Sequence, residues 1–160
     1  MLREHLAPDD PLGGYAARLA DPALRPDVRG FLTGSLDLVL RLPGGRFAIA
    51  DHKTNWLGAP GEPLTAWHHR PVALAHEMEH AHYGLQALLY TVALHRYLRW
   101  RLRGYDPDAH IAGVLYLFLR GMTGAEVPRV DGAPCGVFAW KPPGALVVAL
   151  SDLLDRGGAA

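Results

Sequence analysis

A hairpin in the first third of the chain constrains the fold more than any other stretch. The sequence GSLDLVLRLPGGRFAIADHKTNWLG spans residues 34–58 and holds two apolar runs around a Pro-Gly-Gly turn. Apolar runs on either side of such a turn predict two antiparallel strands, at residues 31–42 and 46–53. Each predicted strand carries an aspartate, Asp37 or Asp51, where a buried strand favours an apolar side chain.

The length of the turn decides whether these two acids meet. With a three-residue turn, counting back along the strands sets Asp37 directly opposite Asp51. With a two-residue Gly-Gly turn, Asp37 lies opposite His52 and Asp51 points to the other face. In the first register the Cβ atoms of the two acids lie about 4.5–5.5 Å apart, and carboxylates this close repel unless a cation lies between them.

Lys53 adds a positive charge to this pair of acids. It follows Asp51 by two residues, so both side chains leave the same face of the strand. A hard divalent ion such as Mg²⁺ prefers carboxylate oxygens and retained water, and a lysine beside it can hold a water or offset charge on a phosphate. In the register that joins the acids, the three side chains predict metal-assisted hydrolysis. The alternative is an ordinary solvated ion pair at the end of a strand.

The rest of the chain predicts an α/β fold. Residues 1–30 predict a lead-in segment with one short helix near residues 15–19, and the three prolines of residues 58–72 predict a loop. Helical spacing predicts a helix at residues 73–103, with a break near Gly84, and a final helix at residues 144–154. Apolar runs predict strands at residues 110–120 and 136–140. With the hairpin, these elements indicate a central mixed β-sheet flanked by α-helices.

Composition narrows the functional classes. The 160 residues are 49% hydrophobic and 20% charged, as in one globular domain with a real core. The 16 basic residues balance the 16 acidic ones, which neither indicates nor excludes a nucleic-acid partner. Cys135 is the single cysteine, which excludes an internal disulfide. With no signal-like or bilayer-spanning run, the sequence predicts a cytoplasmic protein with no membrane partner.

A second motif points to different chemistry. Residues His76 to His80 read HEMEH and fit H-E-x-x-H, in which two histidines bind Zn²⁺ and the glutamate acts as a base. The positions that would extend the motif hold Tyr83 and Gln86 instead of glycine and histidine. The sequence offers no obvious third ligand, so it favours a solvated or DNA-facing helix over a zinc protease.

The ordered motifs resemble one family of nucleases. Asp37 and the run Asp51-His52-Lys53 are similar to the D…(D/E)-x-K signature of the restriction-endonuclease-like PD-(D/E)XK superfamily. The runs GSLDLVLR, DHKTNWLG, YGLQALLYTVALHRYLRWRLRGYD and GVLYLFLRGM resemble the C-terminal nuclease domain of exodeoxyribonuclease V beta subunits, the RecB type. The resemblance implies a restriction-endonuclease-like core over residues 31–160.

The resemblance also implies an activity and its residues. It implies Mg²⁺-dependent cleavage of DNA phosphodiesters during double-strand-break processing and recombinational repair. Asp37 and Asp51 would be metal ligands, with the backbone carbonyl of His52 as another, and Lys53 would be the catalytic lysine.

Three accessory residues are expected nearby. Gln86 and Tyr90 match the family's Q-x-x-x-Y motif, and their i, i+4 spacing places both polar tips on one helix face, where they reach DNA or orient Lys53. Arg120, at the end of the apolar strand, is expected either to contact a phosphate or to be a plain solvated arginine.

The implied partners are DNA, RecC-like and RecD-like subunits and a RecB helicase region. The family takes a further metal-ligand histidine from an upstream helix, which nothing in residues 1–36 matches, because His5 lacks the apolar helical setting. No G-x-x-x-x-G-K-[ST] loop for ATP occurs either. We therefore expect a nuclease core without a motor, as a fragment or a stand-alone domain. The alternative is a truncated, catalytically weak or inactive remnant that binds DNA or subunits.

Overall fold

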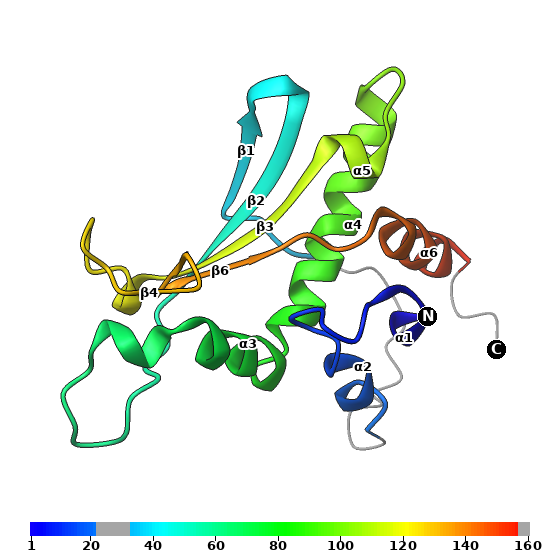
Figure 1. Cartoon of the computed structure of the whole chain (residues 1–160). Coiled ribbons are helices and arrows are strands. Elements are labelled where there is room, and N and C mark those ends of the chain that lie inside the picture. The colour runs from blue at the N-terminus through cyan, green and yellow to red at the C-terminus, as the bar shows by residue number, and fades with distance from the viewer. Residues whose placement is uncertain (22–32, 157–160) are drawn as a thin grey trace.

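The structure, a computed structural model, describes residues 1–21 and 33–156 (Figure 1). In the described part of the chain, no helix is both long and apolar enough to span a bilayer. The elements in chain order are α1 (Leu2–His5), α2 (Tyr15–Arg18), β1 (Leu38–Leu42), η2 (Pro43–Gly45), β2 (Arg46–Lys53), η3 (Ala66–His69), α3 (Pro71–His80), α4 (Tyr83–Arg101), α5 (Pro107–His110), β3 (Ile111–Phe118), η4 (Leu119–Gly121), β4 (Arg129–Val130), β5 (Ala133–Pro134), β6 (Val137–Trp140) and α6 (Gly144–Asp155).

The hairpin has the three-residue turn. Leu42 of β1 pairs with Arg46 of β2, and the register runs back to Leu38 opposite Ala50. The turn places Gly44 and Gly45 at φ angles of 76° and 73°, a region that disfavours any side chain, so two glycines follow the proline. The three-residue turn is therefore confirmed, but the paired residues end at Leu38, so the predicted pairing of Asp37 with Asp51 lies beyond the ladder.

The first strand is shorter than predicted. Residues 31 and 32 lie outside the described residues, and residues 33–37 are not a strand, so the expected start of the strand is wrong. The physical reason lies at the end of the ladder, where the backbone N–H of His52 donates to the Asp37 carboxylate at 3.0 Å. A side-chain acceptor thus takes a main-chain donor that a longer β1 would have bound.

The sheet is mixed, as predicted. Its strand order is β1-β2-β3-β6, with β2 and β3 parallel and the other neighbours antiparallel. Two parallel strands need a long crossover, and here α3 and α4 provide it. Strand β3 lies between two other strands and is apolar nearly throughout, as in strands that are covered on both faces. Figure 1 shows α3 and α4 beside this sheet, with α6 next to α4. The fold is an α/β fold consistent with a restriction-endonuclease-like core.

The long helical segment is divided close to the predicted place. Helix α3 ends at His80 and α4 begins at Tyr83, with His82 between them in the left-handed region at φ 56°. Gly84, where the break was expected, lies inside α4. A Cβ atom on Gly84 would come within 3.0 Å of the Tyr15 ring, so close packing explains this glycine.

Residues near the N-terminus contribute to the core. Leu12 and Tyr15 are fully buried in the same apolar cluster as strand β3. The Trp140 indole of β6 donates to the Asp10 carboxylate at 3.1 Å. The short helix α2 coincides with the one predicted near residues 15–19.

Candidate active site

Asp51 lies on the core-facing side of β2, at its C-terminal end. Strand alternation puts it on the same face as Ile49, which is buried in the core, and only 3% of Asp51 is exposed. A buried carboxylate requires a compensating charge. The Nζ atom of Lys53 supplies that charge at 2.5 Å from Asp51 Oδ2. The two residues therefore form a nearly buried ion pair where β2 ends.

A polar network from two other elements holds the lysine. The Nζ atom of Lys53 donates to Gln86 Oε1 of α4 at 3.0 Å, and the Tyr116 hydroxyl of β3 donates to the same oxygen at 3.1 Å. The Gln86 amide nitrogen donates to the Tyr90 hydroxyl at 3.0 Å. From the sequence, Gln86 was expected either to reach DNA or to orient Lys53, and in the structure its side chain contacts Lys53.

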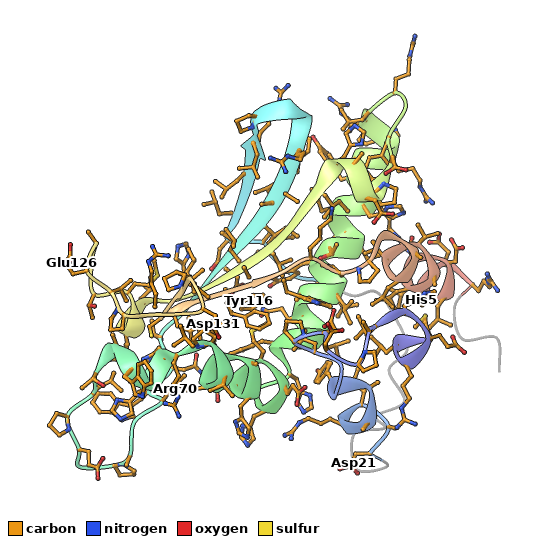
Figure 2. All side chains as sticks on the ribbon, in the orientation of Figure 1. His5, Asp21, Arg70, Tyr116, Glu126 and Asp131 are labelled. Carbon is orange, nitrogen blue, oxygen red and sulfur yellow. The ribbon has the colours of Figure 1, made fainter. Side chains whose placement is uncertain are left out.

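Two tyrosine rings complete the surroundings of the ammonium, and the sequence analysis missed both. Lys53 Nζ lies 4.1 Å from the Tyr83 ring centroid and 5.1 Å from that of Tyr116, within the range of cation–π attraction. Figure 2 shows Tyr116 where the sheet meets the helices. Burial, followed by the charge of Asp51, raises the pKa of Tyr116, so its hydroxyl stays a donor. A tyrosine within an apolar strand needs a hydroxyl partner, which was the available signal.

Asp37 reaches the same end of the hairpin from the more open side. Its Oδ2 accepts the His52 backbone N–H and lies 3.4 Å from His52 Nδ1. That backbone hydrogen bond is the main cause that lowers the pKa of Asp37, and the charge of Lys53 adds to it. Asp37 and Asp51 both act electrostatically on Tyr116. The Asp37 carboxylate is thus held at His52, whereas the buried Asp51 carboxylate pairs with Lys53.

The donor atoms of the predicted metal ligands are of the kind that a hard cation prefers. The two carboxylates and the His52 carbonyl offer oxygen only, and the buried Oδ2 of Asp51 has a charge contact with Lys53 but no aligned hydrogen bond. Within residues 1–21 and 33–156, no three His, Cys, Asp or Glu side chains are grouped as a metal-binding set. Mg²⁺ is commonly held by one or two carboxylates together with substrate phosphate and water. The residues present fit that ion.

The segment after Lys53 is anchored by Asn55. Its side-chain nitrogen donates to Glu77 at 2.8 Å, its side-chain oxygen accepts from the Tyr83 hydroxyl at 3.2 Å, and its carbonyl lies 3.2 Å from the buried His69 ring. The end of β2 is thereby tied to η3, α3 and α4. These contacts could not be predicted from the sequence, because each joins segments far apart in the chain.

Arg120 lies beside the same segment. Its Nε donates to the Thr54 carbonyl at 2.8 Å, and its guanidinium carbon lies 5.8 Å from the Trp56 ring centroid. The side chain is therefore held next to the residues that follow Lys53, and it remains exposed there. This position is compatible with the predicted phosphate contact.

The H-E-x-x-H motif has a structural explanation. The rings of His76 and His80 stack with centroids 6.0 Å apart, and the Glu77 carboxylate accepts the Asn55 amide. The glutamate that would act as a base in a zinc protease therefore supports the segment after β2.

Fold and site together define a class. A mixed four-stranded sheet flanked by helices is consistent with a restriction-endonuclease-like core, and two aspartates and a lysine lie where its hairpin ends.

Comparison with known proteins identifies the relative, although no family model matches the chain. The chain is 57% identical to the RecBCD enzyme subunit RecB of Mycolicibacterium smegmatis over 97% of its length, and 56% identical to that of Mycobacterium tuberculosis over 98%. It is 40% identical to the RecB subunit of Escherichia coli over 79% of its length. It spans 14% of each mycobacterial protein and 10% of the Escherichia coli protein. The resemblance to RecB expected from the motifs is thus confirmed, over most of this chain and a small part of RecB.

Proposed function

We propose that this chain is a Mg²⁺-dependent deoxyribonuclease domain that hydrolyses DNA phosphodiesters in RecBCD-type processing of double-strand breaks. The observation that carries the proposal is the position of Lys53, which joins the buried Asp51 to Gln86 at the end of β2. The similarity to RecB supports the setting in DNA repair and recombination.

Asp37, Asp51 and the His52 carbonyl would hold the metal. Mg²⁺, when bound, supplies positive charge and Lewis acidity toward a phosphate. The chain contributes the oxygen donors and a partly buried setting, in which charges act more strongly than in water.

Lys53 provides the remaining positive charge. An ammonium group has three donors, of which one faces Asp51 and one faces Gln86. The third would bind a phosphate oxygen or position the attacking water. Because Gln86, Tyr116 and the Tyr83 ring already hold Lys53, the group needs little reorganisation when charge develops on the phosphate.

The proposed partners are DNA, RecC-like and RecD-like subunits, and the helicase region of RecB if the chain is a fragment. The complex named for the relatives supports these subunits.

A second candidate function is a catalytically weak or inactive RecB-like remnant that binds DNA or partner subunits. One contact favours it, because the Lys53 ammonium lies directly on the Asp51 oxygen that a metal would need. If this ion pair persists in the presence of Mg²⁺, the site keeps its charges but does not bind the ion.

A cleavage assay separates the two candidates. The chain is incubated with linear DNA and Mg²⁺ beside Asp51→Ala, Lys53→Ala and a control, Lys141→Ala, which alters an exposed lysine bonded to the Asp108 carbonyl. The nuclease proposal predicts cleavage by wild type and control, about 10²–10³-fold less cleavage by the two site variants, and none with EDTA. Equal cleavage by all four proteins, or cleavage by none, would contradict it.

A further inference from the structure

We propose that a cleft beside the candidate active site binds the bases of a single DNA strand, by stacking them on Trp56 and Trp67. The proposal deepens the proposed function and rests on it, because the bound strand is the one whose phosphate reaches Lys53.

The cleft lies between the segment after β2 and the start of α3. It has a volume of about 480 Å³, and its lining includes Trp56, Leu57, Arg70, Val72, His76 and Glu77. Figure 2 shows Arg70 at the η3–α3 end of this region. The walls therefore combine an aromatic ring, aliphatic side chains and a guanidinium group.

Two exposed tryptophans each lie beside an arginine: Trp56 lines the cleft, and Trp67 lies next to the lining residue Arg70. Trp56 is 51% exposed, and the Arg120 guanidinium lies 5.8 Å from its ring centroid. Trp67 is 52% exposed and lies against the cleft residue Arg70, whose guanidinium is 5.7 Å from the ring centroid and donates to the Trp67 carbonyl at 3.1 Å. Half-exposed indole rings held by cations present flat surfaces to a ligand.

These surfaces suit single-stranded nucleic acid. Proteins that bind single strands pair a positive path for the backbone with aromatic side chains on which bases stack. Arg70 and Arg120 supply the positive charge, and the one acid in the cleft lining, Glu77, is engaged by Asn55. A duplex offers no free base faces along its length, so the arrangement favours an unpaired strand.

The cleft and the candidate active site are joined by a short stretch of chain, from Lys53 to the lining residue Trp56. Trp56 follows Lys53 by three residues, a separation that spans at most about 10 Å of extended chain. Arg120 bonds the Thr54 carbonyl within that segment. At about 3.4 Å per nucleotide along a strand, a base on Trp56 lies within about three nucleotides of a phosphate at Lys53.

The binding proposal is tested by measuring the affinity of the chain for a fluorescent oligothymidylate of twelve nucleotides. The measurement is made in EDTA, so that the DNA is not cleaved. Trp56→Ala and Trp67→Ala are each expected to weaken binding about tenfold, whereas Trp56→Phe, which keeps a ring, retains most of it. The matched control is Trp100→Ala. Trp100 is 77% exposed and lies 5.1 Å from the Arg101 guanidinium, but at the opposite end of α4 from Tyr83, about 25 Å away.

Three results would overturn the cleft. The first is that both Trp56→Ala and Trp67→Ala bind the oligonucleotide as tightly as wild type. The second is that Trp100→Ala loses as much affinity as they do. The third is that the two variants lose as much affinity for a twelve-base-pair duplex as for the single strand. If the wild-type chain binds the oligonucleotide through the tryptophans but cleaves no DNA with Mg²⁺, the nuclease proposal is contradicted and the binding proposal is not. If the wild-type chain cleaves DNA and the tryptophan variants bind the oligonucleotide as tightly as wild type, only the binding proposal is contradicted.

Discussion

The ammonium of Lys53 lies 3.0 Å from the side-chain oxygen of Gln86, a residue 33 positions later in the chain. The contact joins the end of β2 to the first turn of α4. Because Gln86 is neutral, it holds the ammonium without cancelling its charge. We therefore propose that Gln86 positions Lys53.

Gln86→Ala should lower the rate of cleavage more than the affinity for DNA. Without the amide, Lys53 loses one of its two polar anchors, and misplacement of a catalytic group costs about 10- to 100-fold in rate. Steady-state kinetics on an oligonucleotide should show a lower kcat at an unchanged KM. An unchanged kcat, or an effect confined to KM, would assign Gln86 to DNA binding instead.

Tyr90→Phe should have a smaller effect. The substitution removes the acceptor of the Gln86 amide at 3.0 Å and leaves the Lys53 contact in place. One neutral hydrogen bond is worth about 0.5–1.5 kcal/mol, so the expected loss in kcat is about two- to tenfold. Tyr97→Phe is the control, since Tyr97 is an exposed tyrosine of the same helix. Equal losses in both variants would show that the effect is not specific to the site.

Asp37 should stabilise the fold only when ionised. The His52 backbone N–H holds the pKa of Asp37 below its usual value of 3.8, so the folded chain releases this proton more readily than the unfolded chain. The stabilisation is present above about pH 4 and is lost as the pH falls through the lowered pKa. Urea unfolding of wild type and Asp37→Asn should therefore show a stability gap at pH 6 that narrows below pH 4. A gap that widens on acidification would reverse the assigned sign.

Cys135 should be unreactive in the folded chain. It is fully buried, and burial raises the pKa of its thiol. Alkylation requires the thiolate, so iodoacetamide at pH 8 should label the protein quickly in urea and very slowly in buffer. Mass spectrometry after timed exposure provides the measurement, and equal rates in the two conditions would show that the thiol is accessible.

The hairpin could be predicted because its information is local. The Pro-Gly-Gly turn allows a three-residue connection through two left-handed glycines, and that connection fixes the register of β1 against β2. The sequence alone left a two-residue turn open, because glycines satisfy both geometries. The start of the first strand was mispredicted because a side chain, Asp37, ends the ladder.

The surroundings of Lys53 could be predicted only in part. The i, i+4 spacing of Gln86 and Tyr90 identified the helix face that reaches it. Tyr116 could not be placed, because its position depends on the parallel register that sets it beside Asp51. That register is formed across more than sixty residues of intervening chain and leaves no local signature.

The most direct test of the account is whether Asp37 and Asp51 hold one divalent ion. Mn²⁺ prefers the same oxygen ligands as Mg²⁺ and can be counted by electron paramagnetic resonance during a titration. We predict one saturable site in wild type and in His80→Ala, which removes a histidine of the H-E-x-x-H motif, with weaker binding in Asp37→Asn and loss in Asp51→Asn. A wild-type chain that binds no Mn²⁺, or aspartate variants that bind it as tightly as wild type, would contradict the account.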